Sequence, residues 1–399
     1  LRILVCGGSV AGTALTYFLS QSLSRYPQLH LSLVVLERSP AFRLAGQNVD
    51  VQEAALAIVR QYPGLEAKIR NFATKSRGIK IVDDKNTVWG QFERELAKTP
   101  DVGDARKDKG DAVDTEEIEV PRGLLAQVFY DETRNLDTVD YRFGDYVVAC
   151  TDQKGGQVEV TLKSGTKEVY DLVVAADGLT SKTRSIAFPP STEYDPIKPL
   201  GMYCAYFSMP HSEELDGRWA RLFGAKGGKS VLLEPDGKGK TRSAFIMKPV
   251  DDQALREELD SAFKAGIEAQ KALVCRIFSE DIWEWPRLRK AMMETDDFYL
   301  SRLAQVKMRK WSNESSNVVL LGDAASCPSP ATGMGAVNAI TASRVLAEQL
   351  VSHHTDLPFA LKEYERVYRP YAEKVQYMFP GQTALFCPMS EWTIYAVRV

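Results

Sequence analysis

The chain opens on a short, mostly apolar run that stops abruptly at glycine. Residues 1–6 have the character of a strand buried in a parallel sheet, and a glycine-rich segment follows directly. Residues 13–23 continue with helical spacing, and residues 31–36 form a second apolar run. Strand, glycine turn, helix and strand in this order predict a βαβ unit, and therefore an α/β fold built on a parallel sheet.

The glycine-rich segment, Gly7-Gly8-Ser9-Val10-Ala11-Gly12, suits the binding of a dinucleotide. Such a fold needs glycine where the strand turns sharply, a small residue where the backbone approaches the pyrophosphate, and glycine where helix meets strand. Gly7, Ser9 and Gly12 occupy these positions. The phosphates would lie at the helix N-terminus, where free N–H groups and the helix dipole favour negative charge. A plain glycine turn is the alternative.

An acidic residue, Glu37, follows the second apolar run. Its carboxylate can accept hydrogen bonds from both hydroxyls of an adenosine ribose, the role of the acidic residue about 20 positions beyond the glycine motif in this fold. Glu37 stands further along the chain, and the loop around Tyr26-Pro27 explains the excess. A solvated charge at a strand end is the alternative. Arg38 beside it either stacks on the adenine or faces water.

Two later strand-like runs also end at an aspartate. Asp177-Gly178 follows one run, and Gly322-Asp323 follows the other. An aspartate at the carboxyl end of a parallel strand lies where open α/β sheets bind ligands, and its carboxylate can hold a sugar or ribityl hydroxyl. Beyond Asp323, the small residues within 331–335 let the chain pass close to a ring system before a helix begins at Ala336.

Together with Gln47 and Arg122, these segments resemble the FAD-dependent aromatic hydroxylases, the class A flavin monooxygenases of the para-hydroxybenzoate hydroxylase type. The resemblance covers residues 1–369. Within that group, segments 46–50, 297–299 and 322–330 are most similar to the tetracycline-inactivating monooxygenases and related natural-product hydroxylases. The resemblance implies FAD as cofactor, NAD(P)H as co-substrate, and a Rossmann-like FAD-binding domain beside a substrate domain built on an antiparallel sheet.

The resemblance also implies roles for individual residues at the cofactor. The AMP half of FAD would be held by Gly7, Ser9, Gly12, Glu37 and Arg38. Gln47 would run past the flavin, and Arg122 would reach its phosphate or ribityl region. Asp177 and Gly178 would serve FAD and NAD(P)H, and Gly322 and Asp323 the ribityl chain and pyrophosphate. The isoalloxazine would be lined by Pro330, Gly333, Gly335 and Ala336.

Three departures from the family pattern bear on the contacts to the flavin. Ser9 replaces a glycine, and Ser326 stands where many relatives have histidine. Val337 occupies the usual asparagine position after the paired glycines, with Asn338 one place later.

The chemistry implied by the resemblance belongs to the flavin. NAD(P)H would reduce it, O2 would add at its C4a carbon, and the resulting hydroperoxide would hydroxylate an aromatic or polycyclic small molecule. No catalytic residue is assigned, because no protein nucleophile is required. Halogenase, Baeyer–Villiger or epoxidase activity on the same fold is the alternative, the first suggested by Trp283 and Trp285. A non-catalytic FAD-fold protein is a remote alternative, and a serine hydrolase using Ser9 lacks an Asp and His partner.

Changes in sequence character along the chain predict its domains. We expect a first part of the FAD-binding domain at 1–190, a β-rich substrate domain at 191–311, a return to the FAD domain at 312–370, and a C-terminal helical segment at 371–399. Tyr203 and Phe223 are the candidates for lining the substrate pocket, with ordinary core packing as the alternative. The aromatic C-terminal segment is expected to pack along the boundary between the two domains.

Composition excludes several classes of function. With 50 basic and 53 acidic residues and a net charge of −3, the chain gives no reason to expect nucleic acid or an anionic membrane as partner. Six scattered cysteines and four histidines predict a reduced cytoplasmic protein without a metal site. The apolar runs fall short of the roughly 20 residues a membrane span needs. We expect a monomer or weak dimer acting on a small molecule.

Overall fold

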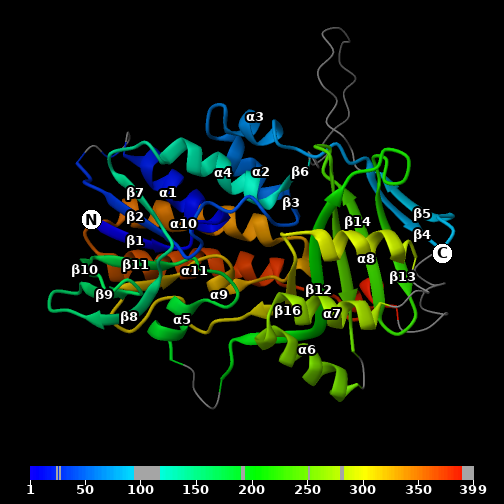
Figure 1. The fold of residues 1–399 in the computed structure, drawn as a ribbon. Helices are drawn as coiled ribbons and strands as arrows, with labels where there is room; N and C mark the ends of the chain where they lie inside the picture. Colours follow the sequence, from blue (N-terminus) through cyan, green and yellow to red (C-terminus); the bar gives the residue numbers. More distant parts are fainter. Residues whose placement is uncertain are drawn as a thin grey trace, which may run out of the picture.

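The computed structural model of the 399-residue chain describes residues 1–23, 26, 28–93, 117–189, 194–249, 252–278 and 283–388. Its first sheet is parallel throughout, with strand order β17-β11-β1-β2-β7 (Figure 1). The predicted βαβ unit is confirmed, because the first two strands are adjacent and parallel across the first helix. The bounds are β1 Arg2–Cys6, α1 Val10–Ser22, β2 Ser32–Glu37, β7 Val139–Phe143, β11 Leu172–Ala175 and β17 Val318–Leu320.

The parallel sheet lies between a helical layer and a small antiparallel sheet. Alternation along β1 directs Ile3 and Val5 into the core shared with the helices, and Leu4 and Cys6 into the core shared with the small sheet. Burial of both faces explains why these strands read as continuous apolar runs. The helical layer contains α2 Glu53–Arg60, α3 Leu65–Arg70, α4 Arg122–Thr133, α10 Gly335–Ser352 and α11 Leu357–Val375 besides α1. The small sheet is β8 Val147–Asp152, β9 Val158–Leu162 and β10 Lys167–Tyr170, with α5 Lys182–Ala187 packed nearby.

A second, larger sheet stands beside the first (Figure 1). Its order is β16-β12-β15-β14-β13-β4-β5, and all neighbouring pairs are antiparallel except β13 and β4. The β-rich middle of the chain was expected, but the recruitment of β4 and β5 from the first quarter of the chain was not. The bounds are β4 Gly78–Val82, β5 Val88–Glu93, β12 Ile197–Pro210, β13 Ala220–Ala225, β14 Lys229–Pro235, β15 Lys240–Met247 and β16 Tyr299–Val306.

Three helices cover the face of this sheet that points away from the parallel sheet. Phe245 of β15 packs against Phe278 and Trp285, with ring centroids 4.9 and 6.0 Å away. The segment 253–277 forms two helices, because the chain is broken at Gly266 with φ +99°, and residues 279–282 lie outside the described chain. The covering helices are α6 Gln253–Ala265, α7 Ile267–Ile277 and α8 Trp285–Glu294.

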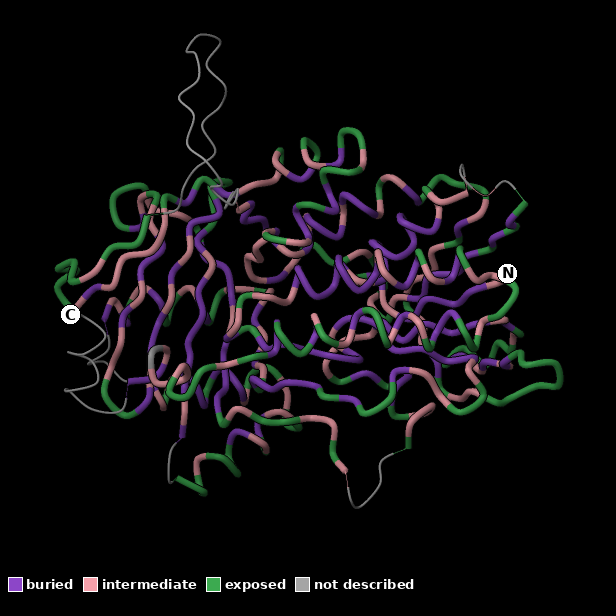
Figure 2. The backbone as a smooth tube through the Cα atoms, turned by 180° about the vertical axis from the view of Figure 1, so that it is seen from behind, coloured by how far each residue is buried: buried purple, intermediate pink, exposed green. Residues whose placement is uncertain are grey.

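Short elements join the two sheets. In the tube view, the inner strands of both sheets are mostly buried, and the exposed chain lies mainly in loops (Figure 2). The connecting elements are β3 Asn48–Val51, which pairs with β6 Ile118–Pro121, together with α9 Asp323–Ser326, a 3₁₀ turn at Pro330–Thr332, and α12 Gln382–Phe386. Within the described ranges, no helix is long and apolar enough to cross a membrane.

Candidate functional site

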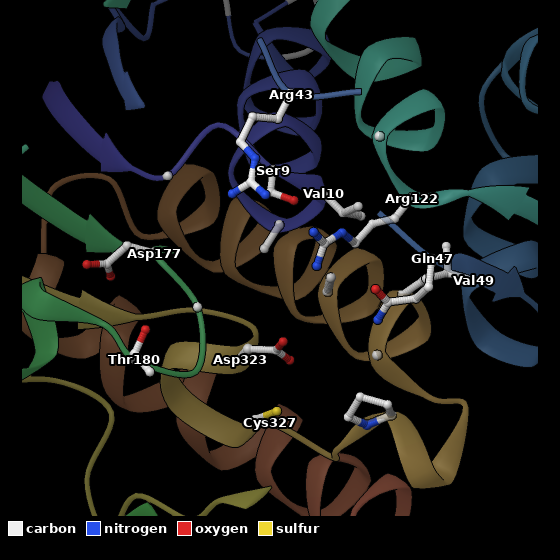
Figure 3. A pocket seen from close by; sticks show the side chains of 18 of the residues that line it. Ser9, Val10, Arg43, Gln47, Val49, Arg122, Asp177, Thr180, Asp323 and Cys327 are labelled. Carbon is white, nitrogen blue, oxygen red and sulfur yellow. The ribbon is translucent and has the colours of Figure 1, made fainter. Parts of the chain in front are cut away.

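A cavity of about 480 Å³ extends from the carboxyl ends of the parallel strands to the inner face of the seven-stranded sheet. Figure 3 shows the part that lies between α1 and the segment around Asp323. Most of the candidate residues named from the sequence therefore lie around this one cavity. Those that line it are Gly7, Ser9, Glu37, Arg38, Gln47, Arg122, Asp177, Gly178, Asp323, Pro330, Gly333, Gly335 and Ala336.

Two predicted glycines, Gly12 and Gly322, do not line the cavity but shape it. A Cβ on Gly12 would collide with the carbonyl oxygen of Gly7, so only glycine lets α1 approach β1 this closely. Gly322 has φ +58°, and a Cβ there would lie 3.0 Å from the Cβ of Ala11. Both residues let helices and strand ends meet at the edge of the cavity.

The start of α1 faces the cavity with its polar groups available. Gly7 has φ +119° and turns the chain out of β1 under the carbonyl of Ala176. Ser9 stands at the N-cap position without a side-chain capping bond, and α1 has no acidic residue in its first turn. Free N–H groups and the positive end of the helix dipole therefore point at the cavity, as binding of a phosphate group requires.

Glu37 lies at the end of β2, beside this turn. Its Oε2 accepts a hydrogen bond from the Gly8 N–H at 3.0 Å, and its Oε1 accepts one from the Ser39 N–H at 2.9 Å. A carboxylate has about four acceptor positions, so capacity remains for the hydroxyls of a ribose. The two backbone bonds fix the carboxylate in place at the cavity wall.

Two arginines bring positive charge to the cavity. Arg43 and Arg122 reach in from the side of α1 and α4, opposite Asp323 and Cys327 (Figure 3). Arg122 was identified as a candidate from the sequence. Arg43 was not, because a single arginine in a loop belongs to no recognisable sequence motif. Gly46 allows the close approach of this loop, since a Cβ there would lie 3.0 Å from Nε of Arg122.

Asp323 follows β17 and begins α9. Burial raises the pKa of its carboxyl, and the nearby Arg122 guanidinium and Cys327 thiol oppose this rise. The carboxylate is therefore an acceptor kept in a partly desolvated position, where a hydrogen bond to a ligand hydroxyl would be strong. Burial in turn raises the pKa of Cys327 well above its usual range, so its thiol stays protonated.

Asp177 lines the cavity wall and also stabilises the local backbone. Its Oδ2 accepts hydrogen bonds from the N–H and hydroxyl of Thr183, both at 3.0 Å, and its Oδ1 accepts one from the Ser181 hydroxyl. The Ser181 hydroxyl also caps α5 by accepting from the Arg184 N–H. These bonds hold the segment after β11 as a rigid rim of the cavity.

The departures at Ser326 and Asn338 form one buried pair. The Ser326 hydroxyl donates to Oδ1 of Asn338 at 3.2 Å, and Nδ2 of Asn338 donates to the Ser326 carbonyl at 3.1 Å. The Tyr368 hydroxyl donates to the same Oδ1 at 2.9 Å. Asn338 is fully buried and outside the cavity lining, so this pair joins α9 to α10 and leaves ring contacts to the segment 328–336.

Tyr203 and Phe223 do not line the cavity, contrary to the sequence prediction. Tyr203 packs under the covering helices, and its hydroxyl donates to Asp260 at 3.3 Å. Phe223 stacks on Trp283 at 5.4 Å between ring centroids, in the same core. Both faces of the sheet carry apolar side chains. The alternation of residues along a strand therefore shows which side chains share a face, but it does not show which face borders the cavity. The residues of this sheet that line it are Met202, Tyr206, Leu232, Glu234, Ala244, Ile246 and Leu303.

Gln47 connects the cavity to the seven-stranded sheet. Its Oε1 accepts a hydrogen bond from the Tyr299 hydroxyl, and its carbonyl accepts one from the Arg122 N–H at 3.0 Å. Tyr299 stacks on Tyr206, with ring centroids 4.9 Å apart. Gln47 therefore lies where the wall from the parallel-sheet unit meets the wall from the second sheet.

The beginning of the C-terminal segment bridges the same two walls. Gln382 donates to the Ala331 carbonyl at 2.9 Å, and Lys248 of the second sheet region donates to the Thr383 hydroxyl at 3.0 Å. Phe386 lines the cavity, and Cys387 is buried against the sheet. Residues 382–388 therefore contact both walls of the cavity, whereas 389–399 lie outside the described chain.

Comparison with known proteins defines the class to which this fold and site belong. The model of the FAD binding domain family matches residues 1–377, and the chain belongs to that family, as a relative of FAD-dependent monooxygenases. FAD is the cofactor that defines the family. Within the ranges that the structure describes, no group of three or more His, Cys, Asp or Glu side chains could hold a metal ion.

Particular relatives cover nearly the whole chain. The monooxygenase CTB7 of Cercospora beticola is 32% identical, covering 100% of this chain and 90% of the relative. The FAD-dependent monooxygenase asL6 of Sarocladium schorii is 31% identical over 94% of this chain and 86% of the relative. Among solved structures, the tetracycline destructase Tet(51) shares the fold with a TM-score of 0.77 at 24% identity, covering 100% of this chain and 94% of that one.

Proposed function

We propose that the protein is an NAD(P)H- and O2-dependent monooxygenase that hydroxylates an aromatic or polycyclic small molecule. The observation that carries this proposal is one continuous cavity that joins the glycine turn before α1 to a largely apolar chamber on a β-sheet. The family membership supplies FAD, and the monooxygenase relatives support oxygen insertion as the reaction class. When bound, the flavin supplies the activation of oxygen, and the protein supplies binding, orientation and shielding.

The residues of the cavity fit FAD from one end to the other. Glu37 would hold the adenosine ribose, and the N-terminus of α1 with Ser9 would hold the pyrophosphate, supported by the positive charge of Arg43. Asp323 would accept a hydrogen bond from a ribityl hydroxyl, with Arg122 nearby.

The ring end of the cavity has a different lining. Pro330, Gly333, Gly335 and Ala336 would pass along the isoalloxazine, because small residues allow backbone to lie against a flat ring. The N-terminus of α10, which begins at Gly335, would favour negative charge at the edge of that ring.

The substrate would lie between this ring position and the inner face of the seven-stranded sheet. Met202, Leu232 and Leu303 give that chamber an apolar wall suited to an aromatic ligand. The C-terminal residue Phe386 closes part of the chamber, which helps exclude water from the reacting atoms. Halogenation is less well supported, since Trp283 and Trp285 are packed in the core between the covering helices and the sheet.

Two measurements on the purified protein test the proposal. Its absorbance spectrum should show oxidised flavin, and heat or acid should release FAD. NADH or NADPH oxidation should then be stimulated by members of a panel of phenolic and polycyclic compounds, with a product heavier by one oxygen atom. A protein that cannot be loaded with FAD, or that oxidises NAD(P)H without oxygenating any panel member, would argue against this function.

A further inference from the structure

The chamber wall contributed by the seven-stranded sheet contains a carboxylate among apolar side chains. On β14, Leu232 and Glu234 line the cavity, while Val231 and Leu233 lie in the core beneath the covering helices. Alternation along the strand therefore fixes the Glu234 side chain on the cavity face. Among the described residues that this sheet gives to the cavity lining, Glu234 is the acidic one.

Two residues on the same face of the sheet lie next to Glu234. Tyr206 lines the same wall, and the charge of Glu234 adds to the burial that raises the pKa of that phenol. Arg242 is the cross-strand partner of Glu234 on β15, so the two side chains share one face of the sheet. Arg242 is itself held in place, because it donates a hydrogen bond to the Gly46 carbonyl.

We propose that Glu234 positions the substrate by accepting a hydrogen bond from a phenolic hydroxyl. The inference rests on the proposed function and assigns to Glu234 the selection of ligands that carry a hydroxyl. A carboxylate at a mostly apolar wall gives a flat ligand one favoured orientation, because the ligand gains a hydrogen bond by presenting its hydroxyl there. Charged acceptors form stronger hydrogen bonds than neutral ones, so the hydroxyl contributes to affinity as well as to orientation.

The apolar side chains around Glu234 favour a neutral hydroxyl over a cationic group. A protonated amine entering the chamber would lose its hydration against Met202, Leu232 and Leu303. A hydroxyl carries no charge to desolvate, and it donates its hydrogen to the carboxylate. Methylation of the hydroxyl removes that hydrogen and adds bulk at the same point.

The test compares a phenol with its methyl ether, measured by equilibrium dialysis against the FAD-loaded protein. The probes are 1-naphthol and 1-methoxynaphthalene, and the readout is the ratio of their dissociation constants. We expect the unaltered protein to bind 1-naphthol about tenfold more tightly, although the ether is the more apolar ligand. Glu234→Met should bring the ratio close to one, and Glu234→Gln, which keeps a neutral acceptor, should retain part of the preference.

The control is Glu213→Gln, since the Glu213 side chain is 90% exposed and lies outside the cavity lining. This variant should keep the ratio of the unaltered protein. Equal affinity for both probes in the unaltered protein, including no binding of either, would overturn the inference, as would an unchanged ratio in Glu234→Met. If Glu234→Met does not fold, an unchanged ratio in Glu234→Gln decides against it. Failure of the proposed function shows separately, as absence of FAD or of NAD(P)H oxidation.

Discussion

Arg184 donates a hydrogen bond from Nη1 to the carbonyl of Ala324 at 3.0 Å, which ties the motif after β11 to the motif after β17. Its Nη2 donates to the Leu179 carbonyl at 2.7 Å, within the first motif. The guanidinium is buried, and that burial lowers its pKa. The strand ends that carry Asp177 and Asp323 are distant in sequence. The Arg184 side chain therefore fixes the spacing between them.

Replacing this side chain should separate the two motifs. Arg184→Met should lower the free energy of unfolding by about 2–4 kcal/mol, because two carbonyls lose a charged donor, and should also weaken FAD binding. Urea unfolding and FAD titration measure the two effects. Arg134→Met is the control, since the Arg134 side chain is half-exposed at the end of α4. Equal unfolding midpoints for the two variants would contradict the linking role.

We expect the Asp323 carboxylate to lower the stability of the FAD-free protein at neutral pH and to strengthen FAD binding. Its pKa is raised in the folded protein, so the folded state holds the proton more tightly than the unfolded state. Stability from this group is therefore present at low pH and is lost as pH rises above the ordinary aspartate value and through the raised pKa. Asp323→Asn should make the FAD-free protein more stable at pH 7, and the difference should shrink towards pH 4.

The same Asp323→Asn protein should bind FAD less tightly, because it lacks the charged acceptor that we propose for a ribityl hydroxyl. Urea unfolding of the FAD-free proteins at several pH values, followed by FAD titration at pH 7, tests both statements. Asp140→Asn, at an exposed carboxylate on β7, provides the comparison. A variant that is less stable at pH 7 and binds FAD fully would show that Asp323 serves the fold.

Gly12→Ala should displace α1 from β1. The added methyl group would meet the Gly7 carbonyl, and overpacking of this kind costs about 1–3 kcal/mol. Because the N-terminus of α1 is the proposed site for the FAD pyrophosphate, we expect FAD affinity to fall by about tenfold or more. Gly90→Ala is the matched control, where the nearest atom to the new Cβ is an Ile81 methyl at an ordinary 3.5 Å. Indistinguishable FAD titrations for the two proteins would refute the packing argument.

Removal of residues 382–399 should uncouple the reaction while leaving FAD bound. The described part of this segment contacts the loop at Ala331 and the second sheet near Lys248, and Phe386 lines the chamber. Its loss admits water to the reacting atoms, so NAD(P)H oxidation should yield more hydrogen peroxide per product. Product and peroxide are measured together. Normal coupling in the shortened protein would mean that the segment only packs.

Sequence reasoning reached the cofactor half of the site because its signals are local. Gly7, Gly12 and Asp323 each stand at a strand end or a helix start, where backbone geometry restricts the residue type. Their cofactor roles remain predictions, but their convergence on one cavity follows from strand order. Arg43 escaped detection because its position depends on the course of a loop.

The substrate half could not be predicted because both faces of the second sheet are covered. Tyr203 and Met202 are equally apolar neighbours on β12, one under helices and the other at the cavity. A strand buried on both faces has no polar side to mark its outward direction. The recruitment of β4 was also hidden, since its partner β13 lies far along the sequence.

That pairing governs how the chain can fold. Ile79 of β4 lies opposite Ala220 of β13, so the second sheet stays unfinished until residues far downstream have been synthesised. The parallel sheet is likewise incomplete until β17 has been synthesised, because Val318 of β17 pairs with Val173 of β11. The parallel sheet therefore cannot close before the whole second sheet has been made, and contacts of such sequence separation form slowly. Cutting the gene at the apparent domain boundary should therefore yield two fragments that aggregate separately and assemble only when expressed together.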